Sequence, residues 1–378
     1  MVACAVAVLL ALMASADARP PESRLAELRA GIAITNWFRF PPRADAGSFR
    51  AYLSDSALAD LRESGFTHVR LPVQPELLWQ DGAIDPSRVA SVIKAVQRIH
   101  SARLAAVVAL APSTWRLEAF APDRLRLLAT WRVLARALAY LDQSRTFPEI
   151  LNEPVFGNDE HSWEALQAEA LAAIRESLPD ATVVLTGAQW GGVDGLRVLT
   201  PVSDPNVVYS FHFYEPAELT ALAAYRSDLD RTAMSHLPFP ADPTRCRSAV
   251  QEMSGATRDV AAFYCASGWD AAHIGARFDQ VTSWARSCGG SGPPCAVLLG
   301  EFGATSELPS ATRLSWIEAV RAAADAHGFG WTLWGYDDVM GCNIARPPPL
   351  RPRLEPALLT ALGLRTGAAQ RAARQGFD

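Results

Sequence analysis

The chain has 378 residues, of which 49% are hydrophobic and 20% are charged, and its formal net charge is −5. This composition is typical of a globular protein with a sizeable core, and it excludes an intrinsically disordered chain. The sequence has no basic stripe, which argues against nucleic acid as a partner.

The first 18 residues differ in character from the remainder of the chain. An apolar run over residues 5–13 is followed by small residues that end at Ala18, a pattern typical of a signal-peptidase site. The basic residues that usually precede such a run are missing, and the run is too short to span a bilayer comfortably. We predict a signal peptide over residues 1–18, a secreted or periplasmic protein, and no membrane association once this leader is removed.

Eight short runs rich in Val, Ile and Leu alternate with longer segments of helical period. The runs are predicted as strands over 31–35, 66–71, 104–109, 149–152, 182–186, 207–212, 296–300 and 331–334. The main predicted helices cover 56–64, 85–100, 122–143, 162–178 and 310–327, and a short last helix begins at about residue 356. This alternation indicates parallel βα units, and eight of them fit a closed barrel better than an open sheet. We therefore predict a single α/β domain, a (β/α)8 TIM barrel, over residues 19–364, followed by a frayed tail over 365–378.

The segment 214–294 is predicted as an elaborated loop and helix between the sixth and seventh strands. It holds four cysteines, and the close pairs Cys246/Cys265 and Cys288/Cys295 are candidates for disulfides in an oxidising compartment. The alternative is that these cysteines are buried free thiols. No C-x-x-C spacing occurs, which excludes a zinc ribbon, and Cys342 has no obvious partner.

Active sites of (β/α)8 barrels form at the C-terminal ends of the strands. Polar, ionisable or aromatic residues follow five of the predicted strands, namely Arg70, Asn152 and Glu153, His212 and Tyr214, Glu301, and Trp334. Two of these residues are carboxylates, which is what glycoside hydrolysis requires: one donates a proton to the leaving oxygen and the other attacks the anomeric carbon. Strands four and seven lie across a small barrel, so the two carboxylates are expected to approach to the roughly 5–5.5 Å that retaining enzymes use.

This set of strand-end residues resembles glycoside hydrolase family 5, the cellulase family of (β/α)8 retaining glycosidases. The opening strand, with Asn36, Trp37 and Phe38 after it, is also similar, and the resemblance covers roughly residues 30–364. One feature departs from the family pattern. The usual histidine at the end of the third strand is missing, because that strand ends in Ala109, Leu110 and Ala111. The missing side chain normally shapes the sugar subsite beside the scissile bond, so its absence weakens any inference about the substrate.

The resemblance implies a role for each matching residue. Glu153 is the acid/base and Glu301 the nucleophile, and Arg70 and Tyr214 hold Glu301 ionised by donating hydrogen bonds to it. Asn152 binds the sugar 2-hydroxyl.

His212 orients Glu153, and Trp334 is a platform under the sugar. Each of these residues has a structural alternative, as a salt-bridged strand end or a core side chain. Further aromatic residues follow predicted strands and are candidates for sugar contacts or for the core, namely Trp37, Phe38, Trp79, Trp115 and Trp190; of these, we assign Trp37 to substrate binding.

The predicted function is hydrolysis of a β-linked glucan or related polysaccharide, with retention and by double displacement, as in an endo-β-1,4-glucanase. The alternatives are a transglycosylase, an exopolysaccharide-processing β-glycanase acting on mannan or mixed-linkage glucan, and a non-catalytic glycan-binding barrel. A secreted esterase is excluded because no Gly-x-Ser-x-Gly elbow occurs. No metal-binding His-Glu-x-x-His, phosphate loop or dinucleotide fingerprint is present, so we expect no metal and no cofactor. We expect a monomer whose partner is an oligo- or polysaccharide.

Overall fold

The computed structural model describes residues 19–157, 159–341, 343–344 and 353–365. The predicted signal peptide, Cys342 and all but the first residue of the predicted tail lie outside these ranges. Among the described residues, no helix is both long and apolar enough to cross a membrane.

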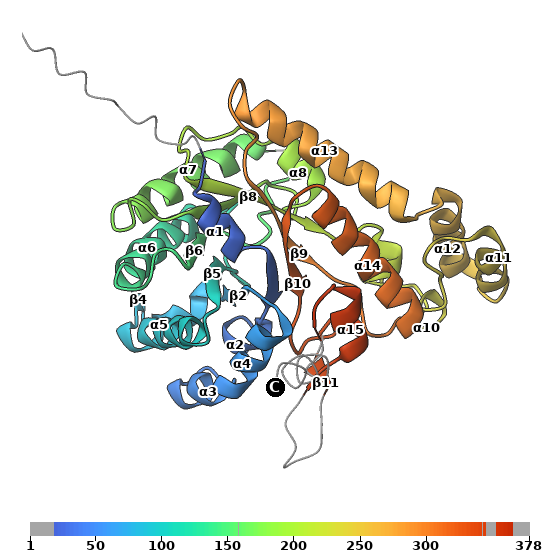
Figure 1. Cartoon of the computed structure of the whole chain (residues 1–378), viewed down its shortest axis with the longest axis horizontal. Helices are drawn as coiled ribbons and strands as arrows, with labels where there is room; N and C mark the ends of the chain where they lie inside the picture. The colour runs from blue at the N-terminus through green and yellow to red at the C-terminus, as the bar shows by residue number, and fades with distance from the viewer. Residues whose placement is uncertain (1–18, 158, 342, 345–352, 366–378) are drawn as a thin grey trace, which may run out of the picture.

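Eight parallel strands form a closed barrel, as predicted (Figure 1). In sequence order they are β1 (Ala30–Ala33), β2 (His68–Val73), β5 (Ala105–Leu110), β6 (Thr146–Glu149), β7 (Val183–Thr186), β8 (Val207–Phe213), β9 (Val297–Phe302) and β10 (Gly330–Trp334). The barrel closes through β1, where Ile32 lies opposite Val69 of β2 on one side and Leu333 of β10 on the other. The strands are buried almost throughout, which explains their near-continuous apolar sequence.

Helices surround the barrel and return the chain to the start of each following strand. The larger ones are α4 (Asp55–Ser64), α5 (Pro86–Ser101), α6 (Ala121–Leu138), α7 (Glu160–Arg175), α13 (Ala271–Gly289) and α14 (Ser310–Ala326), with the short α15 (Pro356–Ala361) at the end. Local signals in the sequence mark their boundaries. Asp85 caps α5 by accepting a hydrogen bond from the Ser87 N–H, with Pro86 in the first turn. Gly65 ends α4 in the left-handed conformation.

The fourth barrel strand was predicted three residues too late. It was expected over 149–152, whereas β6 ends at Glu149. Pro148 and Glu149 interrupt the apolar pattern, so residues 146–149 do not look like a buried strand in the sequence, although β6 is completely buried in the structure. Beyond Glu149 the backbone still bonds to both neighbours, from Ile150 N to Val184 O and from Asn152 N to Leu110 O, but it no longer forms a regular ladder.

The segment between β8 and β9 is more helical than expected. It contains α9 (Ala217–Thr220), α10 (Arg231–Met234), α11 (Pro243–Gln251) and α12 (Gly255–Ser267) before α13. Figure 1 shows α11 and α12 at the side of the barrel. The disulfide Cys246–Cys265 joins α11 to α12, and Cys288–Cys295 links the end of α13 to the segment before β9, which confirms both predicted pairs.

Candidate active site

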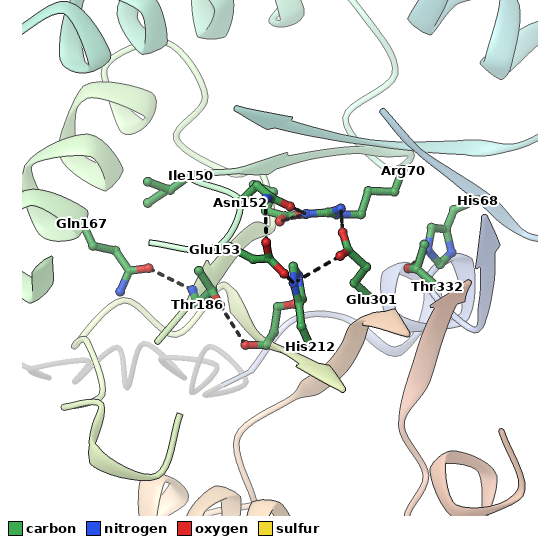
Figure 2. A network of polar contacts seen from close by, with 12 residues as sticks. His68, Arg70, Ile150, Asn152, Glu153, Gln167, Thr186, His212, Glu301 and Thr332 are labelled. Atoms are coloured by element: carbon green, nitrogen blue, oxygen red, sulfur yellow. Dashed lines mark hydrogen bonds and ion pairs between the residues drawn. The ribbon is translucent and has the colours of Figure 1, made fainter. Parts of the chain in front are cut away.

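Arg70 on β2 is the centre of the polar network inside the barrel (Figure 2). Its guanidinium is fully buried and donates to both oxygens of Glu149, at 2.7 and 2.5 Å. It also donates to Glu301 Oε2 at 2.6 Å and to Asn152 Oδ1 at 2.9 Å. Burial alone would lower the pKa of Arg70, but the charges of Glu149 and Glu301 raise it, so the side chain is a fixed cation.

Glu301 lies near the end of β9 and is held by two donors. Arg70 binds one carboxylate oxygen, and the Tyr214 hydroxyl donates to the other at 2.7 Å. Only glycine fits at position 300, directly before Glu301, because a Cβ on Gly300 would lie 1.9 Å from Ser210 Oγ on the neighbouring strand. The side chain of Glu301 is only 2% exposed. The guanidinium of Arg70 and the hydroxyl of Tyr214 therefore fix the position of this buried carboxylate.

Glu153 occupies the opposite side of the site and is more accessible. Its backbone has a φ of 46°, in the left-handed region that residues other than glycine seldom adopt, which is a frequent mark of a functional site. Its carboxylate Oε1 lies 3.0 Å from His212 Nδ1, and its side chain is 25% exposed. Asn152 Nδ2 lies 3.5 Å from the other oxygen, Oε2. Glu153 thus has a proton-carrying partner and an open side, which suits a group that exchanges protons with a ligand.

The two carboxylates lie close together. One oxygen of Glu153, one oxygen of Glu301 and a ring nitrogen of His212 all lie within 4.8 Å of one another. Inverting glycosidases keep their carboxyl groups roughly 6.5–9.5 Å apart to admit a water molecule, and retaining enzymes about 5–5.5 Å. The bound of 4.8 Å applies to the nearest oxygens of the two side chains, and such a close approach is compatible with the shorter of these two separations. Within the described part of the chain this is also the one cluster with metal-ligand geometry, but its carboxylates already accept hydrogen bonds from Arg70, Tyr214 and His212.

Burial and charge set the protonation of these three groups together. Burial lowers the pKa of His212, but the charge of Glu301 and the hydrogen bond to Glu153 outweigh it and raise the pKa. Burial raises the pKa of Glu153, yet the hydrogen bond and charge of His212 reverse the shift, and the pKa falls below its usual value. Burial also raises the pKa of Glu301, and the charge of His212 offsets this only partly. The expectation that the donors Arg70 and Tyr214 lower the pKa of Glu301 is not met, because the burial of its carboxylate outweighs them. Groups this close titrate as a unit, so the roles of the two carboxylates are assigned from their hydrogen-bond donors and their exposure.

Trp334 ends β10 and is partly exposed, as its predicted role as a platform requires. The guanidinium of Arg39, which follows β1, lies 5.1 Å from the centre of the Trp334 ring and 5.0 Å from that of Phe40. Arg39 Nε and Nη1 are shielded and have no hydrogen-bond partner among the described residues. The positive charge of Arg39 acts on both Glu153 and Glu301.

Trp37 does not belong to this site, and its assignment to substrate binding is wrong. The chain leaves β1 after Ala33 and enters a short helix, α2 (Thr35–Phe38). This turn directs the indole into the packing against α3 (Ala46–Ala51), where its Nε1 donates to Phe49 O at 2.7 Å. With 1% of its surface exposed, Trp37 has no face for a sugar.

Sequence reasoning missed two residues, Glu149 and Arg39. Glu149 is 1% exposed, and it pairs with Arg70 from within β6. A glutamate inside an otherwise buried run was the available signal, since a buried charge requires a partner. Arg39 gave a weaker signal, an arginine flanked by two phenylalanines just beyond the first strand. The other predicted residues, Arg70, Asn152, Glu153, His212, Tyr214 and Glu301, are brought together as expected.

A family model described as cellulase (glycosyl hydrolase family 5) matches residues 33–338. The chain belongs to glycosyl hydrolase family 5. This membership places it among the O-glycosyl hydrolases, and the expected family resemblance is confirmed.

Curated relatives in the family carry endoglucanase names. Endoglucanase 3 of Fibrobacter succinogenes is 26% identical over 83% of this chain and 50% of its own length. Endoglucanase C of Acetivibrio thermocellus is 26% identical over 54% of this chain and 62% of its own length. The chain thus spans about half to three-fifths of the length of these two curated relatives.

Solved structures show the same fold. An endoglucanase of the hyperthermophilic Thermotoga maritima has a TM-score of 0.71 at 22% identity, and the match covers 91% of this chain and 99% of that one. The cellulose synthase subunit Z of Clostridioides difficile has a TM-score of 0.68 at 24% identity, over 88% and 99% of the two chains.

Proposed function

We propose that this family 5 protein is a retaining β-glycosidase that cleaves a β-linked glucan within the chain, with Glu301 as nucleophile and Glu153 as acid/base. The observation that carries the proposal is the approach of the two carboxylates to within 4.8 Å, each held by a different set of partners. The endoglucanase names of the relatives and the cellulase family, together with a solved structure of the same fold whose name is endo-beta-1,4-glucanase, support β-1,4-glucan as the substrate class.

The two carboxylates take different roles because Glu301 is buried and fixed by two donors, whereas Glu153 is partly exposed. Glu301, fixed by Arg70 and Tyr214, attacks the anomeric carbon and forms a glycosyl ester. Glu153, partly exposed and bonded to His212, protonates the leaving oxygen and then removes a proton from the water that cleaves the ester. Asn152 is positioned by Arg70 to bind the sugar 2-hydroxyl. If a sugar hydroxyl replaced this water, the same groups would catalyse transglycosylation.

Export of the protein is part of the same proposal. Two disulfides in the β8–β9 segment support an oxidising compartment. A glycanase outside the cytoplasm would also meet polymeric substrate directly. The non-catalytic alternative has less support, because a binding protein would not need two buried or half-buried carboxylates this close together.

The test combines two variants with a stereochemical readout. Glu301→Gln is expected to lower kcat on β-1,4-glucan by roughly 10³-fold or more, since the covalent step is lost. Glu153→Gln is expected to cleave a substrate whose leaving group needs no protonation, to stall at the ester, and to regain turnover with azide. Glu176→Gln, a half-exposed surface glutamate paired with Arg132, is the matched control and should behave as wild type. The first product, followed by NMR, is expected to be the β-anomer; an α-anomer, or full activity of Glu301→Gln, would overturn the assignment.

A further inference from the structure

A second concave site lies on the rim of the barrel, outside the catalytic network. It is a cavity of about 410 Å³ between the segment after β2 and the segment after β5. Its lining includes aromatic and charged residues, namely Glu76, Trp79, Asp81, Trp115, Phe120 and Arg126. We call this cavity the rim pocket.

Aromatic rings form the walls of the rim pocket. The Trp79 and Trp115 rings meet nearly at right angles, with centres 6.4 Å apart. Phe120, directly before α6, keeps 49% of its surface exposed. Aromatic residues in the core of a protein need no special explanation. Aromatic rings that meet at an angle and remain accessible to solvent form a surface on which the C–H face of a ligand packs.

Hydrogen bonds to one side chain, that of Glu76, hold the two segments of the pocket together. Glu76 Oε1 accepts hydrogen bonds from the backbone N–H groups of Ser113, Thr114 and Trp115, at 2.9, 2.7 and 3.1 Å. The Trp79 indole in turn donates to Thr130 on α6 at 3.0 Å. Both tryptophans are therefore fixed before any ligand arrives, which lowers the entropic cost of binding. The second oxygen, Glu76 Oε2, is shielded and has no hydrogen-bond partner among the described residues.

The charges in the rim pocket disfavour an anionic ligand. Three carboxylates, Glu76, Asp81 and Asp123, line the pocket against one guanidinium, that of Arg126. Arg126 is already engaged, since it pairs with Asp123 at 3.0 Å and lies over the Trp79 ring at 6.0 Å. An anionic ligand would face unbalanced negative charge. Carboxylates that accept hydrogen bonds, beside aromatic faces, match instead a neutral sugar, whose hydroxyls donate and whose ring faces are apolar.

The position of the pocket connects it to the catalytic end of the barrel. Its two segments leave the C-terminal ends of β2 and β5, which are neighbours, and β5 also pairs with β6, the strand that leads to Glu153. We propose that the rim pocket is a secondary binding site for a neutral β-glucan chain, which anchors polymer beside the catalytic cleft. This inference rests on the proposed function for the identity of the sugar.

The experiment compares a long and a short neutral substrate. Trp115→Ala and, as the less buried alternative, Phe120→Ala are expected to raise KM for hydroxyethyl cellulose by roughly 5-fold, about the effect of one lost aromatic contact, with kcat unchanged. Kinetics on cellotetraose are expected to stay at wild-type values. The matched control is Tyr140→Ala, which removes an 88% exposed aromatic residue between α6 and β6, at the opposite end of the barrel.

Equal losses on both substrates would place these residues in the catalytic cleft, and unchanged KM for the polymer would show that the pocket binds no glucan; either result overturns the inference. Affinity electrophoresis in hydroxyethyl cellulose, with Glu301→Gln alone and combined with Trp115→Ala, measures binding without turnover. If wild type cleaves neither substrate, the proposed function fails, while the gel still tests the pocket. Retardation of the double variant equal to that of Glu301→Gln alone would count against the pocket, because the catalytic site is the same in both.

Discussion

The two ends of the barrel interior are built from the same strands but are stabilised by different means. At one end, Phe147, Val184, Val208 and Leu298 form an apolar cluster that is closed by Leu28, just after α1 (Glu22–Glu27). Figure 1 shows α1 lying across this end of the barrel. Two residues further along β6, on the same side of the strand, Glu149 belongs to the charged network of the other end.

The same change of character occurs on β8, where Val208 belongs to the apolar cluster and His212 to the catalytic site. Apolar packing has no directional requirement and tolerates a change of shape at similar volume. A buried charge depends on each of its partners, because losing one leaves the other uncompensated. The catalytic end therefore loses more stability from a single substitution than the apolar end does.

The largest expected effect separates the two ends directly. Glu149→Gln leaves the buried Arg70 without its two-oxygen partner and is expected to lower the free energy of unfolding by about 3–5 kcal/mol. Phe147→Leu, two residues away, is expected to cost roughly 1–2 kcal/mol and to leave kcat unchanged. Urea unfolding of both variants measures the difference.

A triple variant sharpens this test. Arg70→Met with Glu149→Leu and Glu301→Gln removes the guanidinium and both carboxylates that pair with it. It is expected to regain much of the stability while remaining inactive, because the proposed nucleophile is gone. Equal destabilisation by Glu149→Gln and Phe147→Leu would contradict the contrast between the two ends.

A smaller effect is expected where His68 packs against β1. A Cβ at Gly31 would lie 1.9 Å from His68 Nε2, and the buried His68 ring is held by Thr332 at 2.9 Å. Gly31→Ala is therefore expected to cost about 1–3 kcal/mol through overpacking. In the background of His68→Ala the same substitution should cost much less, because the clash is gone; additive losses in thermal unfolding would refute the steric explanation.

The smallest expected effect is a pH dependence at the rim of the catalytic end. Burial, with the charges of Asp337 and Glu301, raises the pKa of Asp338 to about 6, although hydrogen bonds from Met340 N and Thr35 Oγ1 oppose the shift. The folded protein thus keeps a proton that the unfolded chain has released, so the free energy of unfolding falls as pH rises from about 3.8 to about 6.

In Asp338→Asn, the decrease in the free energy of unfolding between these pH values is expected to be smaller than in wild type by roughly 1 kcal/mol. This is less than the full pKa difference implies, because the side chain is partly exposed. Melting temperatures of wild type and variant at pH 4 and pH 7 provide the measurement. Parallel curves for the two proteins would contradict the prediction.

Much of the fold and most of the candidate site can be predicted from the sequence. Eight apolar runs separated by helical segments implied a barrel, and the rule that parallel strands present their C-terminal ends together grouped Arg70, Glu153 and Glu301 before any coordinates. The end of the fourth strand was misplaced because Pro148 and Glu149 disguise a buried segment. Trp37 was misassigned because chain position alone does not say which way a side chain points after a strand ends.

The periodicity of the elements, the candidate cysteine pairs and the residue types at each strand end can be read from residue order alone. These are local properties, set by neighbours along the chain. The ion pair of Glu149 with Arg70, the position of Arg39 over Trp334 and the contact of Trp79 with Trp115 depend on the folded barrel. Each of these contacts joins residues at least 30 positions apart, and its energy depends on burial and orientation that appear only once the barrel has closed.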